Sequence, residues 1–256
     1  MTALVTGASG ATGKLLVQQL LWSGHKVKII IRPDSNVPDN WTGNENLTMI
    51  GRKIAEISVE EMSGYIADCQ SAACCLGHNL SLKGIYGQPR KLVTDSVKVL
   101  CEAIQKNSPD MPVRFVLMNT AGNSNRDLDE HISFGQKIVI GLLRLLLPPH
   151  IDNENAADYL RVNIGQKNPY IEWAAVRPDT LTDSEKVSEY FLHKSPTRSA
   201  IFNAGKSSRI NVAHFMARLL TDDEMWNKWK GQMPVIYNES DQTKIANSAN
   251  KNSNLS

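Results

Sequence analysis

The amino-acid sequence predicts an α/β fold built around a doubly wound parallel sheet. Short apolar runs alternate with longer segments of helical periodicity along most of the chain, which is typical of strand–helix–strand units. The apolar runs lack a regular polar face, as expected for strands that helices cover on both sides. A glycine-rich loop joins the first strand to the first helix. The predicted strands are residues 3–6, 27–31, 47–50, 71–76, 113–119 and 171–177.

The predicted helices rest on apolar residues that recur every three or four positions. Residues 92–106 show this best, because Val93, Val97, Leu100 and Ile104 share one face. An adjacent pair of prolines is expected to separate two of the later helices. The expected helices are residues 14–22, 58–66, 92–106, 128–147, 156–166, 212–220 and 225–230.

The chain is expected to form one domain over residues 1–238. A length of 256 residues can bury a substantial core as one unit, whereas two equal domains would each be small. After the sixth strand the pattern loosens, which indicates a small C-terminal extension on the substrate side. Residues 239–256 are rich in Asn, Ser and Lys and have almost nothing to bury, so we expect a disordered polar tail.

Composition excludes several kinds of partner. A net charge of +2, with no block of basic residues, argues against nucleic-acid binding. The most apolar stretch, residues 138–147, is about half the length that a membrane span requires. No secretory signal precedes the first strand, so a cytoplasmic protein with a small-molecule substrate is expected. The sequence leaves open whether the protein is a monomer or a homodimer, and no residues have metal-ligand spacing.

The glycine-rich loop predicts a dinucleotide-binding, Rossmann-type unit. Gly7 permits a tight turn, Gly10 lets the backbone approach a diphosphate, and Gly13 allows the helix to pack closely on the strand. The N-terminus of the following helix offers unpaired N–H groups to the same diphosphate. The predicted loop contacts are Gly7, Ala8, Ser9, Gly10, Ala11, Thr12 and Gly13.

The end of the second strand predicts NADP(H) as the cofactor. An Arg at this place pairs with a 2′-phosphate, whereas a carboxylate binds the ribose 2′-hydroxyl of NAD. The chain has Arg32 first, followed by Pro33 and Asp34. Arg32 therefore favours NADP(H). Asp34 keeps NAD(H) possible, although it lies beyond a turn-forming proline.

These motifs resemble the atypical branch of the short-chain dehydrogenase/reductase superfamily, most of all its NmrA-like and biliverdin reductase B/flavin reductase group. The resemblance covers residues 2–237 and includes the GxxGxxG spacing. It also includes a fourth strand that ends in Leu-Gly, a fifth strand that ends in Asn-Thr, and a sixth that ends in Arg-Pro. The resemblance implies cofactor contacts at Leu76, Gly77, Asn119, Thr120 and Pro178. Where the group has Gly-Asp after its third strand, this chain has Gly51-Arg52, and Arg52 is another possible phosphate partner.

The catalytic pair of the superfamily is absent from its expected place. Alcohol- and carbonyl-active members use Tyr-x-x-x-Lys, in which the Lys lowers the pKa of the Tyr. Here the candidate is Tyr159, and Asn163 follows it by four residues. Tyr159 is therefore either a catalytic acid or only a helix residue that packs or lines the pocket. Thr120, at the carboxyl edge of the fifth strand, is the better catalytic candidate, because the group has Ser or Thr there.

Other polar residues near the same edge are secondary candidates. Asn123 and Ser124 extend the loop that begins at Asn119 and could bind a substrate, or they could simply form turns. His78, followed by Asn79, is a possible proton donor without an identified partner. His131 and His150 flank residues 128–147, where surface or helix-capping roles are expected.

Three functions are compatible with this pattern. The first is an NADP(H)-dependent oxidoreductase that reduces a small flavin, quinone or carbonyl substrate without the usual Tyr-Lys dyad. The second is a regulator, similar to NmrA-like proteins, that senses NADP(H) and presents the apolar side chains Ile138, Leu142, Leu145 and Leu146 and its polar tail to a partner. The third is a nucleotide-sugar epimerase-like enzyme, which depends most on the missing pair. For these four side chains, packing against the protein's own core is the expected alternative.

Overall fold

The computed structural model describes residues 1–78, 86–128, 130 and 133–238. Asn79, His131 and the tail 239–256 lie outside the described residues. Within the described part of the chain, no helix combines the length and the apolar character that a membrane span requires.

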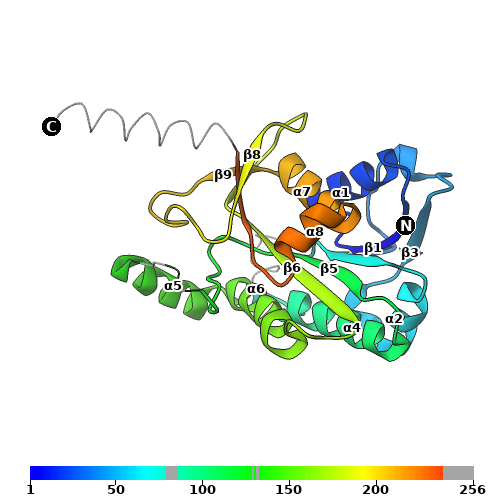
Figure 1. Ribbon diagram of the computed structural model, residues 1–256, viewed down its shortest axis with the longest axis horizontal. Helices are drawn as coiled ribbons and strands as arrows, with labels where there is room; N and C mark the ends of the chain where they lie inside the picture. Colours follow the sequence, from blue (N-terminus) through cyan, green and yellow to red (C-terminus); the bar gives the residue numbers. More distant parts are fainter. Residues whose placement is uncertain (79–85, 129, 131–132, 239–256) are drawn as a thin grey trace.

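A central sheet of eight strands confirms the predicted α/β fold (Figure 1). Its order is β3-β2-β1-β4-β5-β6-β10-β8, and all neighbouring pairs from β3 to β10 are parallel. From β1 to β3 each new strand is added on one side of the sheet, and from β4 onward new strands are added on the other side of β1. Ligands of such sheets bind at this reversal, between β1 and β4. The strands are β1 (Thr2–Thr6), β2 (Lys26–Ile31), β3 (Leu47–Gly51), β4 (Ser71–Cys74), β5 (Val113–Met118), β6 (Ile171–Pro178), β8 (Tyr190–His193) and β10 (Val235–Asn238).

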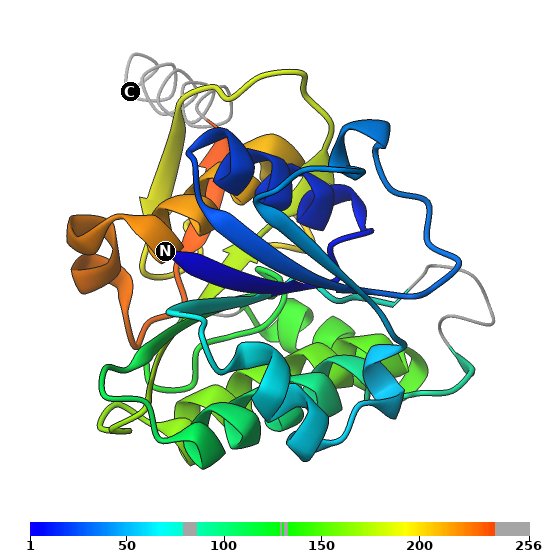
Figure 2. The ribbon, with the colours of Figure 1, turned by 90° about the vertical axis from the view of Figure 1, so that its right-hand side faces the viewer.

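Helices cover both faces of this sheet (Figure 2). Alternate side chains of β1 point to opposite sides, so that Leu4 joins one apolar core while Ala3 and Val5 join the other. One layer contains α2 (Val59–Ile66), α4 (Leu92–Asn107) and α6 (Pro148–Asp158), and the other contains α1 (Ala11–Trp22), α7 (Arg209–Thr221) and α8 (Asp223–Trp229). Short 3-10 turns occur at Asp39–Trp41 and Ile54–Glu56.

Helix α5 (Phe134–Leu146) begins six residues later than the predicted helix 128–147. Ser133 caps it by accepting a hydrogen bond from the Gln136 backbone N–H, and Glu130 is held outside it by Arg177. The expectation that its apolar side chains pack on the protein's own core is wrong for four of them. These four residues are 50–78% exposed: Ile138, Leu142, Leu145 and Leu146.

The next helix corrects the predicted boundary at 156–166. Helix α6 starts at Pro148 and continues as a π-helical turn over Tyr159–Ile164. Pro148 and Pro149 do not separate two helices; they occupy the first turn of α6, where a missing N–H costs nothing. The result is that residues 150–154 are helical and lie at the carboxyl edge of the sheet.

The C-terminal region contains strands that the sequence pattern did not reveal. β8 pairs antiparallel with β10, and β7 (Thr180–Thr182) pairs with β9 (Lys206–Ser208) in a separate two-stranded sheet. These strands have three or four residues each, too few to show a period. Of these strands, β10 and β8 extend the main sheet beyond β6.

Candidate cofactor-binding site

The glycine loop after β1 has a geometry that only glycine permits at two positions. Gly7 has φ +72°, and a Cβ there would lie 2.5 Å from the Cys75 carbonyl carbon. A Cβ on Gly13 would lie 2.2 Å from the carbonyl oxygen of Gly7. Side chains at these positions would therefore push the loop away from β4 and from α1. Glycine at both positions therefore lets the loop pack tightly against the residues that follow β4 and against the start of α1.

Helix α1 directs its N-terminus into this loop. Its N-cap residue, Gly10, provides no side-chain cap, and the first helical bond runs from Lys14 N–H to Gly10 C=O. The preceding N–H groups of the first turn have no partner within the helix and carry the positive end of the helix dipole. The Ala8 side chain is fully buried and Thr12 is nearly so, while Ala11 is exposed. This end of α1 therefore fits an anionic diphosphate.

A cleft of about 390 Å³ extends from the glycine loop along the carboxyl ends of β1, β2, β3 and β4. It has the size and the place expected for the adenosine and diphosphate half of a dinucleotide. Seven of the cofactor residues expected from the sequence line it: Gly7, Ser9, Gly10, Arg32, Arg52, Leu76 and Gly77.

Three cations gather at the end of the cleft formed by β2 and β3. The Arg32 side chain is 61% exposed and lies 3.9 Å from the carboxylate of Asp34. Arg52 donates to Glu61 at 2.8 Å, so its guanidinium is held in place, and the third cation, Lys53, pairs with Glu56 at 3.0 Å. The sequence indicates Glu61 only as the capping-box partner of Ser58 at the start of α2, and nothing in its spacing from Arg52 indicates that the two form an ion pair. This end of the cleft is suited to a phosphate group.

The polar residues at the carboxyl edge of β5 lie beyond this cleft and are largely satisfied by one another. Asn119 is 6% exposed and donates to the Asn153 backbone carbonyl at 2.8 Å. Its side-chain oxygen accepts from the Thr120 N–H and from Asn123. The Thr120 hydroxyl accepts from the Gly122 N–H at 3.2 Å and donates to no group among the described residues. The Thr120 hydroxyl thus retains a hydrogen-bond donor.

Arg177 anchors the loop that follows β5. Its side chain is fully buried and makes two hydrogen bonds to Glu130, at 2.7 and 3.0 Å. It also donates to the backbone carbonyls of Asn123, Met233 and Lys194. The next residue, Pro178, accepts from the Ala121 N–H at 2.8 Å. The Arg-Pro pair therefore fixes the backbone around Thr120, and Pro178 lies beside it.

His78 has a partner that the sequence did not identify. Its Nε2 lies 2.8 Å from the Asp152 carboxylate, and both side chains are almost completely buried. Asp152 also accepts from the N–H groups of Val93 and Thr94 at the start of α4. His78 and Asp152 are 74 positions apart in the sequence, so no local spacing indicates this pair. His78 lines the cleft next to Gly77.

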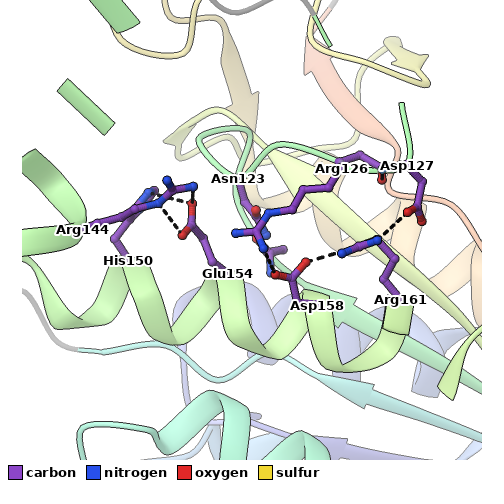
Figure 3. A network of polar contacts seen from close by, with 10 residues as sticks. Asn123, Arg126, Asp127, Arg144, His150, Glu154, Asp158 and Arg161 are labelled. Atoms are coloured by element: carbon purple, nitrogen blue, oxygen red, sulfur yellow. Dashed lines mark hydrogen bonds and ion pairs between the residues drawn. The ribbon is translucent and has the colours of Figure 1, made fainter. Parts of the chain in front are cut away.

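A second buried carboxylate on α6 lies close to the Thr120 loop (Figure 3). Arg144 from α5 binds Glu154 through two hydrogen bonds of 2.8 and 2.9 Å. His150 Nε2 lies 3.4 Å from the Glu154 carboxylate. Burial opposes ionisation of Glu154, but the facing His150 and Arg144 outweigh it and lower the pKa of this carboxyl to about 2. The His150 side chain is 12% exposed and lies beside Gly122 of the loop, so His150 is largely buried and not a surface residue.

The polar network continues along α6 and reaches the loop a second time. Asp158 pairs with Arg126 at 2.6 Å and with Arg161 at 3.3 Å, and Arg161 also pairs with Asp127 (Figure 3). These partly exposed ion pairs hold the loop after β5 against α6, while the fully buried Arg177 holds the same loop from within the protein.

Tyr159 lies in a different place from Thr120. Together with Asn163, Lys91 and Lys98 it lines a separate cleft of about 350 Å³ between α4 and α6. The Lys98 ammonium lies 5.8 Å from the centre of the Tyr159 ring. Burial raises the pKa of Tyr159 to about 12. The structure thus does not bring the two candidate catalytic hydroxyls together.

The glycine loop, the exposed helix N-terminus and the cleft at the winding reversal define a dinucleotide-binding protein of the Rossmann type. The match to a family of known proteins is consistent with this class. The model of a family described as NAD(P)H-binding matches residues 7–223, so the chain belongs to that family. No curated protein matches the chain in sequence.

Solved structures share the fold at low sequence identity. The oxidoreductase ylbE from Lactococcus lactis is 18% identical, with 93% of this chain and 91% of that chain covered and a TM-score of 0.65. A short-chain dehydrogenase/reductase from Veillonella parvula, solved in complex with NADP, is 14% identical over 94% and 95% of the chains, with a TM-score of 0.68. ChuY, an anaerobillin reductase from Escherichia coli O157:H7, is 13% identical over 93% and 98%, with a TM-score of 0.63. At such identities the similarity establishes the shared fold.

Proposed function

We propose that this protein is an NADP(H)-dependent oxidoreductase that reduces a small flavin, quinone or carbonyl substrate. The observation that carries the proposal is the group of cations at the adenosine end of the cleft, Arg32, Arg52 and Lys53. Planar guanidinium groups suit the 2′-phosphate that distinguishes NADP from NAD. Each of these cations has a carboxylate neighbour in the chain. The 3.9 Å contact between Arg32 and the exposed Asp34 is the longest of the three, so Arg32 is the least tightly engaged.

We use the term cofactor track for the residues from the glycine loop to Pro178 that are proposed to contact the cofactor, and each part of it has a proposed role. Gly7 and Gly10 bring backbone N–H groups to the diphosphate, and the N-terminus of α1 stabilises its charge. Leu76 and Gly77 lie beside the ribose, while Asn119 and Pro178 border the nicotinamide. The bound cofactor supplies the hydride; the chain has to orient it, exclude water and place the acceptor.

Thr120 is the proposed substrate-side residue. Its hydroxyl can donate to a carbonyl oxygen or a ring nitrogen of the acceptor, because no described group accepts its proton. A flavin or quinone can take the remaining proton from solvent. Such substrates therefore do not require the Tyr-Lys pair, which fits a chain that has Asn163 after Tyr159.

Two measurements test this proposal. Calorimetry should give tighter binding of NADPH than of NADH. Loss of nicotinamide absorbance with a panel of flavins, quinones and carbonyl compounds should reveal turnover. Binding of NADPH without oxidation by any acceptor would overturn the reductase activity but leave the cofactor assignment intact. Equal affinity for the two cofactors would overturn the assignment to NADP(H).

A second candidate function is an NADP(H)-sensing regulator without turnover. The observation that favours it is the exposed apolar face of α5 together with the absence of the Tyr-Lys pair at 159 and 163. Saturation with NADPH would then change the affinity for another macromolecule, whereas the acceptor panel would stay inactive. An epimerase-like activity is disfavoured, because that chemistry depends on a catalytic tyrosine near the nicotinamide.

A further inference from the structure

Helix α5 carries an apolar face that no other described element covers. Ile138 and Leu142 are 50% and 51% exposed, and Leu145 and Leu146 are 78% and 56% exposed. These side chains recur at helical spacing and form a single stripe along the helix. Figure 1 shows α5 projecting from the body of the molecule at the carboxyl edge of the sheet. The stripe therefore faces outward along a projecting element.

The side of α5 opposite the stripe packs against the rest of the protein. Ile140 is 6% exposed and packs inward. Arg144 bonds to the buried Glu154 of α6 at 2.8 and 2.9 Å. The helix is therefore held by its inner side, and the outer stripe is not required for packing within the chain.

The stripe continues onto a neighbouring loop. Phe202, which follows β8, is 63% exposed, and its ring lies 3.6 Å from the place where a Gly135 Cβ would stand. Gly141 borders the stripe, and a Cβ there would meet nothing within 4 Å. The absence of a side chain at this position would let a second helix approach closely.

The area of this surface is large for a monomer. The exposed fractions of its five large side chains correspond to on the order of 600 Å² of mainly apolar surface, at the upper end of the range for the largest patch on a soluble monomer. Pairing with an identical surface would bury about 1,200 Å² in total, at the lower end of the range for specific interfaces.

We propose that the protein forms a homodimer in which the α5 stripe packs against the α5 stripe of a second copy. The stripe residues Ile138, Leu142 and Leu145 are uncharged, so the same surface on two copies meets without repulsion. Since the interface is small, we expect a dissociation constant in the micromolar range. The interface uses none of the residues that line the cofactor cleft.

Other occupants fit this surface less well. A small molecule binds in a concave pocket, whereas a projecting helix is convex. A membrane-surface helix needs a polar side rich in free Lys and Arg. α5 has only two basic residues, Lys137 and Arg144, and the guanidinium of Arg144 is engaged by Glu154. A second copy therefore matches the shape and the charge of the stripe best.

Sedimentation velocity between about 1 and 200 µM tests the proposal. The wild-type protein should pass from monomer to dimer in this range. Leu145→Glu should weaken dimerisation at least a hundredfold, because two buried carboxylates would meet an apolar surface. Leu145→Ser should weaken it about tenfold without introducing charge. Met111→Glu, at a site that is 76% exposed and precedes β5, is the matched control and should leave the dimer unchanged.

Two further measurements show whether a variant dimerises less because the interface is lost or because the protein no longer folds, and they test the cofactor assignment independently. NADPH affinity and the thermal unfolding midpoint should be the same in all four proteins. A wild-type protein that stays monomeric at 200 µM would overturn the proposal, and so would a dimer that survives Leu145→Glu. Flotation with vesicles of phosphatidylcholine and phosphatidylglycerol, lost in Leu145→Glu, would overturn it in favour of a membrane surface.

Discussion

The two ends of the proposed cofactor track are built in opposite ways. At the adenosine end, the Arg32 side chain is 61% exposed and its contact with Asp34 is 3.9 Å long. At the carboxyl edge of β5 and β6, the Arg177 side chain is completely buried and bonds to the almost completely buried Glu130. Both ends carry an arginine next to a carboxylate, yet only the second pair is removed from water.

Because of this difference, we expect the exposed arginine to affect cofactor binding and the buried arginine to affect the stability of the fold. An exposed ion pair contributes little to folding, so Arg32 can be replaced at small cost and its effect should appear in cofactor choice. A buried charge that loses its partner destabilises the fold strongly. Arg177 should therefore act on the loop around Thr120 through the stability of the backbone.

The largest expected effect follows from replacing Arg177. Arg177→Met leaves Glu130 buried without its partner and removes three bonds to backbone carbonyls. We expect a loss of about 3–5 kcal/mol in the free energy of unfolding in urea. Arg32→Met serves as the control and should change it by less than about 0.5 kcal/mol. Similar losses for the two variants would remove the contrast between the two ends.

The next effect concerns acid stability and Glu154. The folded-state pKa of Glu154, about 2, lies below the ordinary value of 4.5, so its contribution is present above pH 4.5 and is lost as the pH falls toward 2. The contribution is on the order of 3 kcal/mol. Urea unfolding of the wild type and of Glu154→Gln at pH 7 and pH 3 measures it: the gap between the two proteins should narrow at pH 3. A gap that does not depend on pH would contradict the assigned ionisation.

A smaller effect, expressed in affinity, is expected at the adenosine end. Arg32→Asp removes a partner of the 2′-phosphate and adds a like charge, so NADPH binding should weaken about 10- to 100-fold more than NADH binding. Calorimetry with both cofactors measures the ratio. Asp34→Asn is the control; a selective loss of NADH affinity in that variant would assign the ribose contact to Asp34 instead.

Local patterns in the sequence predicted the parts of the fold that depend on neighbouring residues. The six strands from β1 to β6 were predicted because each is a compact apolar run, and the glycine loop was predicted because its spacing is fixed by the turn. The start of α6 was readable too, since proline favours the first helical turn, but Pro148 and Pro149 were interpreted as a break.

Contacts between distant residues could not be predicted from one sequence. His78 and Asp152, or Arg177 and Glu130, meet only because the sheet brings the ends of its strands together. Nothing in the spacing of these residues indicates a pair. The exposure of the α5 stripe was equally hidden, because an amphipathic pattern predicts an apolar face but not the surface that covers it.

The smallest effect is expected from Tyr159→Phe. Tyr159 lines the cleft between α4 and α6 and not the track that leads to Thr120, and burial raises its pKa to about 12, away from the range of a useful acid. Removing its hydroxyl should therefore change turnover of the best acceptor less than twofold. Thr120→Val, which removes the hydroxyl at the carboxyl edge of β5 while conserving shape, should lower kcat about tenfold with little change in NADPH affinity, because one hydrogen bond to the reacting substrate is lost. Steady-state kinetics of both variants with the same acceptor decide between the two hydroxyls: a larger loss in Tyr159→Phe than in Thr120→Val would move the substrate site to the second cleft.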